Sequence, residues 1–329
     1  MNRRPVKLED PVYNMDRLYE AVAERGHVCV GLDTAAEYLP PGERAKALSD
    51  AQAVLAFNKA LIDATLDAAA CYKVQIAYYE AMGLEGLRTY AETLRYIRGR
   101  GALVIADIKR GDIADTARRY AQAHFEGEFE ADFVTLSPYM GMDSIEPWLS
   151  YAESSGKGAF VLMRTSNQGM RDFEYLELKN GTENPASPYR LYDAVGDKLS
   201  ALAESRMGSR GYGAFGAVVG ADPKSGAGRE EARAIRSRRG NLFFLIPGYG
   251  AQGGAAEDAA LLLRDGNGGV VNASRSILRA WAAELKAAGK ACEGPLCRAD
   301  TSFAAESARR TAFKMRDAIR KAASTSRSA

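Results

Sequence analysis

Residues 102–116 read ALVIADIKRGDIADT, an apolar run that ends in alternating charges. The run at 103–105 is long enough for a buried strand, and Asp107, Lys109 and Asp112 follow it. Because side chains alternate along a strand, Asp107 and Lys109 are expected on one face. Arg110 and the glycine after it break the run, so Asp112 is expected in a loop or in the first turn of the next helix. Charges are costly near a core. The stretch therefore predicts either a structural ion pair that caps a strand or a functional site.

The same pattern, an apolar run followed by a helical stretch, repeats along the chain. We expect strands near residues 28–33, 72–76, 103–105, 133–137, 160–163, 214–219, 242–246 and 269–272. Helical stretches lie near 14–25, 45–69, 80–98, 115–126 and 144–154. Open doubly wound sheets usually stop near six strands, so eight units predict an α/β fold of the (β/α)8 TIM-barrel class.

Two regions fall outside this repeat. Residues 167–198 form a long, polar loop after the fifth strand, which we expect to act as a lid over the strand ends. Beyond the barrel the chain carries a basic helical segment, expected to be a solvated surface helix with a frayed end. The predicted division is an N-terminal extension and helix at 1–26, a catalytic barrel at 27–291 and a helical tail at 292–329.

Composition narrows the class of protein. The 329 residues carry a formal charge of +2, which does not indicate a nucleic-acid surface. No apolar run is long enough to span a bilayer, and the first residues do not resemble a secretory signal, so we expect a cytoplasmic protein without a membrane partner. Cys29 and Cys71 lie in strand-like runs as reduced thiols, and the C-x4-C pair Cys292 and Cys297 has no second pair to complete a zinc site.

Polar side chains gather directly after the apolar runs. In a barrel the carboxyl ends of all strands share one face, which carries the active site. The residues at these positions are Asp33, Asp107, Lys109, Ser137, Arg164, Ser166 and Arg275. Their phasing with the strand ends predicts an enzyme site there.

Residues 248–253, GYGAQG, satisfy the dinucleotide pattern G-x-G-x-x-G. That fingerprint normally opens the first βαβ unit and precedes an acid at the next strand end, whereas here it is in the seventh unit and the next strand ends at Arg275. Loops after strands seven and eight of a barrel commonly bind phosphate. Gln252 can donate to a phosphate and Arg275 can form a bidentate pair with it, so we expect a monophosphate ligand. Alternatively, Arg275 only caps its own barrel end.

Taken together, these motifs resemble the orotidine 5'-phosphate decarboxylase family, in particular its longer bacterial-type branch. The most specific motif is Asp-x-Lys-Arg-x-Asp-Ile at residues 107–113. Supporting motifs are VGLD at 30–33, Lys73 on the second strand, RTSN at 164–167, IPGYGAQGG at 246–254 and VNASR at 271–275. The resemblance covers residues 27–285 in the family's order.

The resemblance implies conversion of orotidine 5'-monophosphate to UMP and CO2 in de novo pyrimidine biosynthesis, without metal or organic cofactor. It also implies a homodimer in which Asp112 and Thr116 reach into the partner's site. The implied catalytic residues are Lys73, Asp107, Lys109 and Asp112, in an alternating array. The implied substrate-binding residues are Asp33 and Thr116 for the ribose, Ser166 for the pyrimidine, and Gln252, Gly254 and Arg275 for the phosphate.

The chemistry explains this array, because loss of CO2 from the ring leaves a carbanion that no carbonyl conjugates with directly. The ammonium of Lys109 would stabilise that charge and then protonate C6, while Asp107 would face the departing carboxylate. Two alternatives stay open: a magnesium-dependent sugar-phosphate decarboxylase on the same barrel, and a non-catalytic UMP-binding barrel. A Schiff-base aldolase is disfavoured, since flanking carboxylates keep a lysine protonated.

Overall fold

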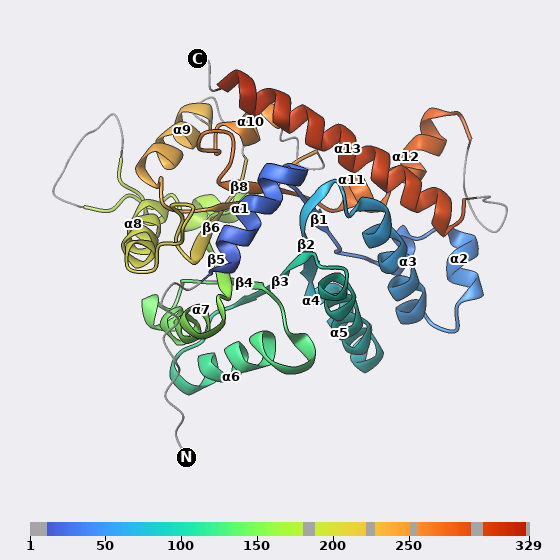
Figure 1. Cartoon of the computed structure of the whole chain (residues 1–329), viewed down its shortest axis with the longest axis horizontal. Coiled ribbons are helices and arrows are strands. Elements are labelled where there is room, and N and C mark those ends of the chain that lie inside the picture. Colours follow the sequence, from blue (N-terminus) through green and yellow to red (C-terminus); the bar gives the residue numbers. More distant parts are fainter. Residues whose placement is uncertain (1–11, 180–187, 222–227, 251–254, 291–298, 327–329) are drawn as a thin grey trace.

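A computed structural model describes residues 12–179, 188–221, 228–250, 255–290 and 299–326 and shows a closed barrel of eight parallel strands (Figure 1). The strands are β1 (Val28–Gly31), β2 (Ala69–Gln75), β3 (Leu103–Arg110), β4 (Phe133–Leu136), β5 (Gly158–Arg164), β6 (Phe215–Val219), β7 (Phe244–Ile246) and β8 (Gly269–Ala273). Each pairs with its neighbours in sequence, and β1 pairs with β8 to close the ring. The predicted TIM barrel is confirmed, and the open dinucleotide-binding sheet is excluded.

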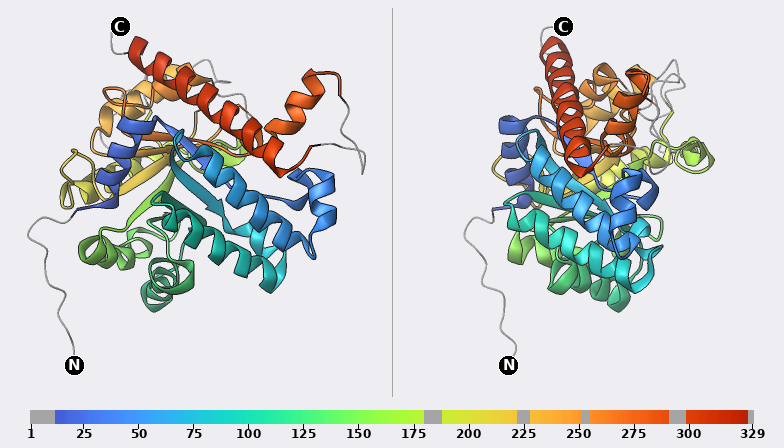
Figure 2. Two further views of the ribbon diagram at one scale, coloured as in Figure 1. Left: turned by 45° about the vertical axis from the view of Figure 1, so that its right-hand side comes forward. Right: turned by 90° about the vertical axis from the view of Figure 1, so that its right-hand side faces the viewer.

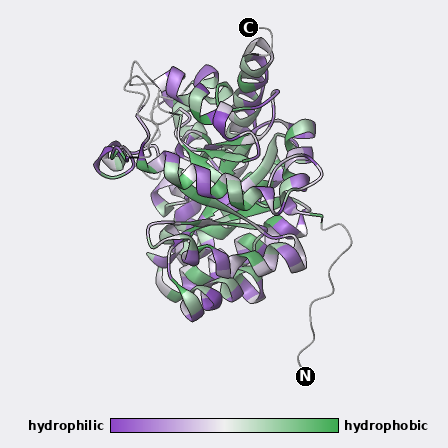
Figure 3. Cartoon of the chain, turned by 90° about the vertical axis from the view of Figure 1, so that its left-hand side faces the viewer, coloured by the Kyte–Doolittle hydropathy of each residue, from purple (hydrophilic) through white to green (hydrophobic). Residues whose placement is uncertain are grey.

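The strands are buried almost throughout, as expected when helices cover a parallel sheet. Figure 3 shows apolar strands in the middle of the molecule and polar residues on the outer helices. A series of ring contacts links Phe133, Phe160, Phe243 and Tyr212, with centroid separations of 5.4, 6.5 and 5.3 Å. Each fully buried large apolar side chain contributes about 1.5–3 kcal/mol to folding.

The helices follow the sequence-based expectations with shifted ends. The main ones are α1 (Asn14–Arg25), α2 (Pro41–Lys46), α3 (Asp50–Thr65), α4 (Ile76–Glu80), α5 (Gly83–Gly99), α6 (Ala114–Phe125), α7 (Leu149–Ser155), α8 (Leu191–Glu204), α9 (Gly228–Arg238), α10 (Ala256–Ala260), α11 (Arg275–Leu278), α12 (Ala280–Ala287) and α13 (Thr301–Ser326). The stretch predicted as one helix at 45–69 is divided, because the hydroxyl of Ser49 caps α3 by accepting from the backbone N–H of Gln52.

The helical tail is not solvated, which corrects the sequence-based expectation. Helix α13 packs against α3, α10, α11, α12 and β1 and runs along the barrel as an outer helix (Figure 2). Its buried face consists of Ala304, Ala305, Ala308, Ala312, Met315, Ile319, Ala322 and Ala323. Small alanine side chains let the helix approach closely, so this face packs well although it is only weakly hydrophobic in sequence.

The loop after β5 is shorter than predicted at its C-terminal end. Residues 191–198 belong to α8, so the irregular segment ends at Arg190. It begins with a 3-10 turn (η5, Gln168–Asp172), and Glu177 then bridges to Arg190 in antiparallel fashion. Residues 180–187 lie outside the described residues, and the proposed lid movement stays a prediction.

Two further expectations concern membranes and thiols. Across the described ranges, none of the helices combines the length and the apolar character that a membrane crossing requires. Cys29 and Cys71 are buried free thiols, as expected. The pair Cys292 and Cys297 lies outside the described residues.

Candidate active site

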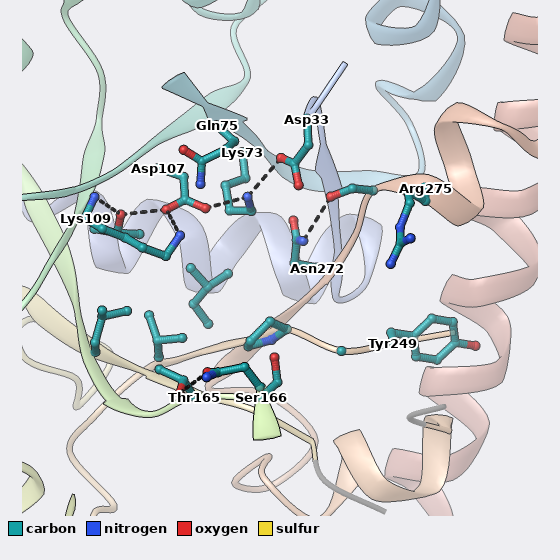
Figure 4. A pocket seen from close by; sticks show the side chains of 18 of the residues that line it. Asp33, Lys73, Gln75, Asp107, Lys109, Thr165, Ser166, Tyr249, Asn272 and Arg275 are labelled. Carbon is teal, nitrogen blue, oxygen red and sulfur yellow. Dashed lines mark hydrogen bonds and ion pairs between the residues drawn. The ribbon is translucent and has the colours of Figure 1, made fainter. Parts of the chain in front are cut away.

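Four charged side chains from three neighbouring strands form a continuous row at the carboxyl end of the barrel (Figure 4). Lys73 Nζ donates to Asp107 Oδ2 at 2.7 Å and to Asp33 Oδ1 at 3.1 Å. Lys109 Nζ donates to Asp107 Oδ1 at 2.7 Å. The parallel register, with Gln75 opposite Asp107, brings the ends of β2 and β3 side by side. We call Asp33, Lys73, Asp107 and Lys109 the charged row.

Burial and mutual attraction act in opposite directions on these groups. Burial disfavours ionised Asp107, but the ammonium groups of Lys73 and Lys109 outweigh it and hold the pKa of this carboxyl well below its ordinary value. Burial likewise disfavours charged Lys73, yet Asp107 and Asp33 raise its pKa above the ordinary value. Both groups are therefore charged at neutral pH, and Lys73 is a poor nucleophile.

The backbone at the end of β3 is distorted where Lys109 leaves the strand. The pairing of β3 with β4 shifts register between Ala106 and Arg110, and Lys109 has a φ of 43°. A left-handed residue other than glycine costs about 1–2 kcal/mol. Thr135 on β4 compensates, because its hydroxyl oxygen accepts the backbone N–H groups of Ile108 and Lys109 at 3.0 and 2.9 Å.

A cavity of about 400 Å³ opens beside the charged row. Figure 4 shows Ser166 and Thr165 on the side opposite the row, and Arg275 with Tyr249 at the end remote from Lys109. The lining also includes Tyr38, Gln75, Tyr78, Thr135, Leu162, Asn167, Val218, Leu245, Pro247, Gly248, Asn272 and Ser274. The lining therefore offers a cation, Arg275, at one end and the charged row with the Ser166 hydroxyl at the other.

The structure brings most of the predicted site residues together. Asp33, Lys73, Asp107, Lys109, Ser166 and Arg275 all line the cavity. Asp112 and Thr116 do not: Asp112 Oδ1 accepts the backbone N–H of Ile113, and Thr116 is exposed on α6. Gln252 and Gly254 lie outside the described residues.

Two of the predicted polar strand-end residues do not line the cavity, and several residues that line it were not predicted. Ser137 and Arg164 are absent from the cavity lining, and Arg164 is fully buried. Sequence reasoning did not single out Thr135, Gln75 or Asn272, which line it. Their only signal is a polar residue inside or at the end of an otherwise apolar strand.

Comparisons with known proteins agree with this geometry. A sequence model described as the orotidine 5'-phosphate decarboxylase / HUMPS family matches residues 26–291. The chain is 52% identical over 307 residues to the orotidine 5'-phosphate decarboxylase of Clostridium perfringens, covering 93% of this chain and 98% of that protein. It is 54% identical over 270 residues to the Clostridium kluyveri decarboxylase, covering 82% and 89%.

Two solved structures are similar to this chain in fold and in sequence. Leishmania donovani OMP decarboxylase superimposes with a TM-score of 0.66 at 31% identity, covering 93% of this chain and all (100%) of that one. Leishmania donovani UMP synthase superimposes with a TM-score of 0.67 at 33% identity, covering 94% of this chain and 57% of that one. With a family match over most of its length and relatives above half identity, the chain belongs to the orotidine 5'-phosphate decarboxylase / HUMPS family.

Proposed function

We propose that this chain is a carboxy-lyase that converts orotidine 5'-monophosphate to UMP and CO2 in de novo pyrimidine biosynthesis. The observation that carries the proposal is the charged row beside the cavity, where two lysines flank an ionised Asp107. The two clostridial relatives above support it, because both are named orotidine 5'-phosphate decarboxylase and this chain matches nearly their whole length.

The cavity orients such a nucleotide in one direction. The phosphate would lie at Arg275, at the end remote from Lys109. The pyrimidine would then lie between Lys109 and Ser166, with Asp33 on the ribose hydroxyls. Gln252 and Gly254 are proposed as further phosphate ligands from the loop after β7.

Decarboxylation would proceed without metal or organic cofactor, through a carbanion at C6. Asp107 would face the substrate carboxylate, and at about 4 Å with an effective dielectric near 20 their repulsion is about 4 kcal/mol, relieved as CO2 leaves. Lys109 would stabilise the carbanion and donate the proton to it. Because this stabilisation acts only on the charge that develops in the transition state, we rank it above the relief of repulsion.

We further propose a cytoplasmic homodimer in which Asp112 and Thr116 complete the partner's site. Asp112 follows the strand that carries Lys109 yet does not line its own cavity. The loop after β3 lies beside the loop after β4, because the backbone N–H of Ser137 donates to the carbonyl of Arg110. Large apolar side chains are exposed on these two loops. The exposed side chains are Ile113 (40%), Tyr139 (81%) and Met140 (49%). Exposed large apolar side chains close to one another are typical of a subunit interface, which supports the proposed dimer.

An absorbance assay for loss of orotidine 5'-monophosphate, run with and without EDTA, tests the proposal. Turnover that EDTA leaves unchanged is the expected result. If the protein does not turn over orotidine 5'-monophosphate but decarboxylates a sugar phosphate, and EDTA abolishes that activity, the magnesium-dependent alternative is assigned. Tight binding of UMP without turnover would assign the non-catalytic barrel.

A further inference from the structure

Arg164 ends β5 with a side chain that is 0% exposed, directly before the residues that face the cavity. Within the described ranges, none of its three guanidinium nitrogens has a hydrogen-bond partner. Its ion-pair partner is Glu231 on α9, with Nη2 to Oε2 at 3.7 Å. A buried cation is costly unless a counter-charge compensates it, so Glu231 stabilises the end of β5.

Glu231 also holds both ends of the loop that follows β5. Its Oε2 accepts from the Tyr175 hydroxyl at 2.6 Å. Its Oε1 accepts from Arg190 Nη1 at 2.7 Å and from the Tyr192 hydroxyl at 3.0 Å. The Arg190 guanidinium in turn lies 4.4 Å from the centre of the Tyr175 ring, within range of a cation–π interaction. One carboxylate thus joins β5, α9, the turn that holds Tyr175 and the start of α8.

A second carboxylate fixes the residue between Arg164 and Ser166. Glu174, beside Tyr175, accepts the backbone N–H of Thr165 at 2.8 Å and its hydroxyl at 2.7 Å. On the other side, the backbone N–H of Gly220 donates to the Arg164 carbonyl at 2.8 Å. A Cβ on Gly220 would lie 2.9 Å from the Ser166 Cα, so the backbones are in close contact here.

We infer that Glu231 is a positioning residue, which sets the place of Ser166 at the pyrimidine end of the cavity by neutralising Arg164 and anchoring the loop base. This inference rests on the proposed function, because that function assigns the pyrimidine to Ser166. Glu231 touches no ligand in this arrangement: it is absent from the cavity lining, and it acts through Arg164 and Tyr175. Its loss would loosen one end of the cavity and leave the phosphate end, at Arg275, in place.

The test compares two ligands on one variant. Calorimetric titration of Glu231→Gln with UMP is expected to show affinity about tenfold weaker than that of the unmodified protein, since small misplacements of a contact are costly. Titration with ribose 5-phosphate, which lacks the pyrimidine, is expected to give an unchanged affinity. The matched control is Glu230→Gln, which makes the same change at an exposed neighbour on α9 and should alter neither affinity.

Equal weakening for both ligands would show a general loss of structure, and no weakening for either would show that Glu231 does not position the site; both results overturn the inference. If Glu231→Gln does not fold, Tyr175→Phe removes one hydrogen bond to the same carboxylate and is expected to show the same selectivity for UMP. Failure of the unmodified protein to bind UMP would instead overturn the proposed function.

Discussion

The hydroxyl of Thr135 donates to Asp107 Oδ1 at 2.8 Å. The Thr135 hydroxyl oxygen also accepts two backbone N–H groups from the distorted end of β3, so its one donor and both acceptor positions are used. One small side chain on β4 therefore fixes both the carboxylate at the centre of the charged row and the backbone that carries Lys109.

Replacing Thr135 by valine, which has nearly the same shape, should lower kcat because Asp107 and Lys109 lose their common support. We expect a fall of about 10- to 100-fold with KM little changed, the size associated with small misplacements of catalytic groups. Thr135→Ser keeps the hydroxyl and should retain most of the activity. Steady-state kinetics of the two variants provide the measurement, and a Thr135→Val enzyme with unchanged kcat would contradict this role.

Arg275→Ala should weaken transition-state stabilisation by about 2–5 kcal/mol, because the proposed phosphate would cover this exposed side chain and pair with it, and truncating one partner of such a charge pair is costly. The comparison of kcat/KM between variant and unmodified enzyme measures this. Lys286→Ala, which removes an exposed cation from α12, is the matched control and should have no effect. Orotidine, which lacks the phosphate, should be a far poorer substrate than orotidine 5'-monophosphate. An Arg275→Ala enzyme with unchanged kcat/KM would contradict the assignment of the phosphate to Arg275.

Mixing two inactive variants tests whether Asp112 acts across a dimer interface. Lys109→Ala and Asp112→Ala place both lesions in one site of a heterodimer and leave the other site intact, because a two-fold contact exchanges the same residues in both directions. With random pairing about half of the dimers are heterodimers, so about a quarter of the original activity should return. If subunit exchange is demonstrated and activity stays at the level of the single variants, Asp112 does not act in trans.

Stability should depend on pH through His124, which is buried against Phe129. Burial, assisted by Arg110, lowers the pKa of its imidazole to about 4. Between that value and the unfolded value of about 6.5 the unfolded chain binds more protons, so stability falls as pH drops through this window, by up to about 3 kcal/mol.

Urea unfolding between pH 4 and pH 7.5 measures this dependence. The glutamine of His124→Gln does not titrate, so the free energy of unfolding of this variant should depend less on pH between about 4 and 6.5. The variant keeps His27, so a difference between the two curves reports on His124 alone. An equally steep curve for the variant would assign the pH dependence to other groups.

The barrel could be predicted from sequence because buried parallel strands are continuous apolar runs, and eight of them alternate with helical stretches along the chain. Asp33, Asp107 and Lys109 could be located because charges directly after such runs share one face. Lys73 lies inside its strand and was found only through the family resemblance. Thr135 and Glu231 could not, since their partners are far away in sequence and no local pattern distinguishes them from ordinary polar residues. Helix α13 was misjudged for another reason: its buried face is mostly alanine, which hydrophobic periodicity weights weakly.

The position of α13 also sets an order for folding during synthesis. The last strand, β8, ends at Ala273, yet the helix that covers β1 and α3 begins only at Thr301. Arg309 of α13 donates to the Ala64 carbonyl and to Asp67, just beyond α3, across more than two hundred residues of chain. A nascent chain that already contains every strand still lacks the helix that covers α3 and β1, so the barrel completes this part of its outer layer only after α13 has emerged from the ribosome.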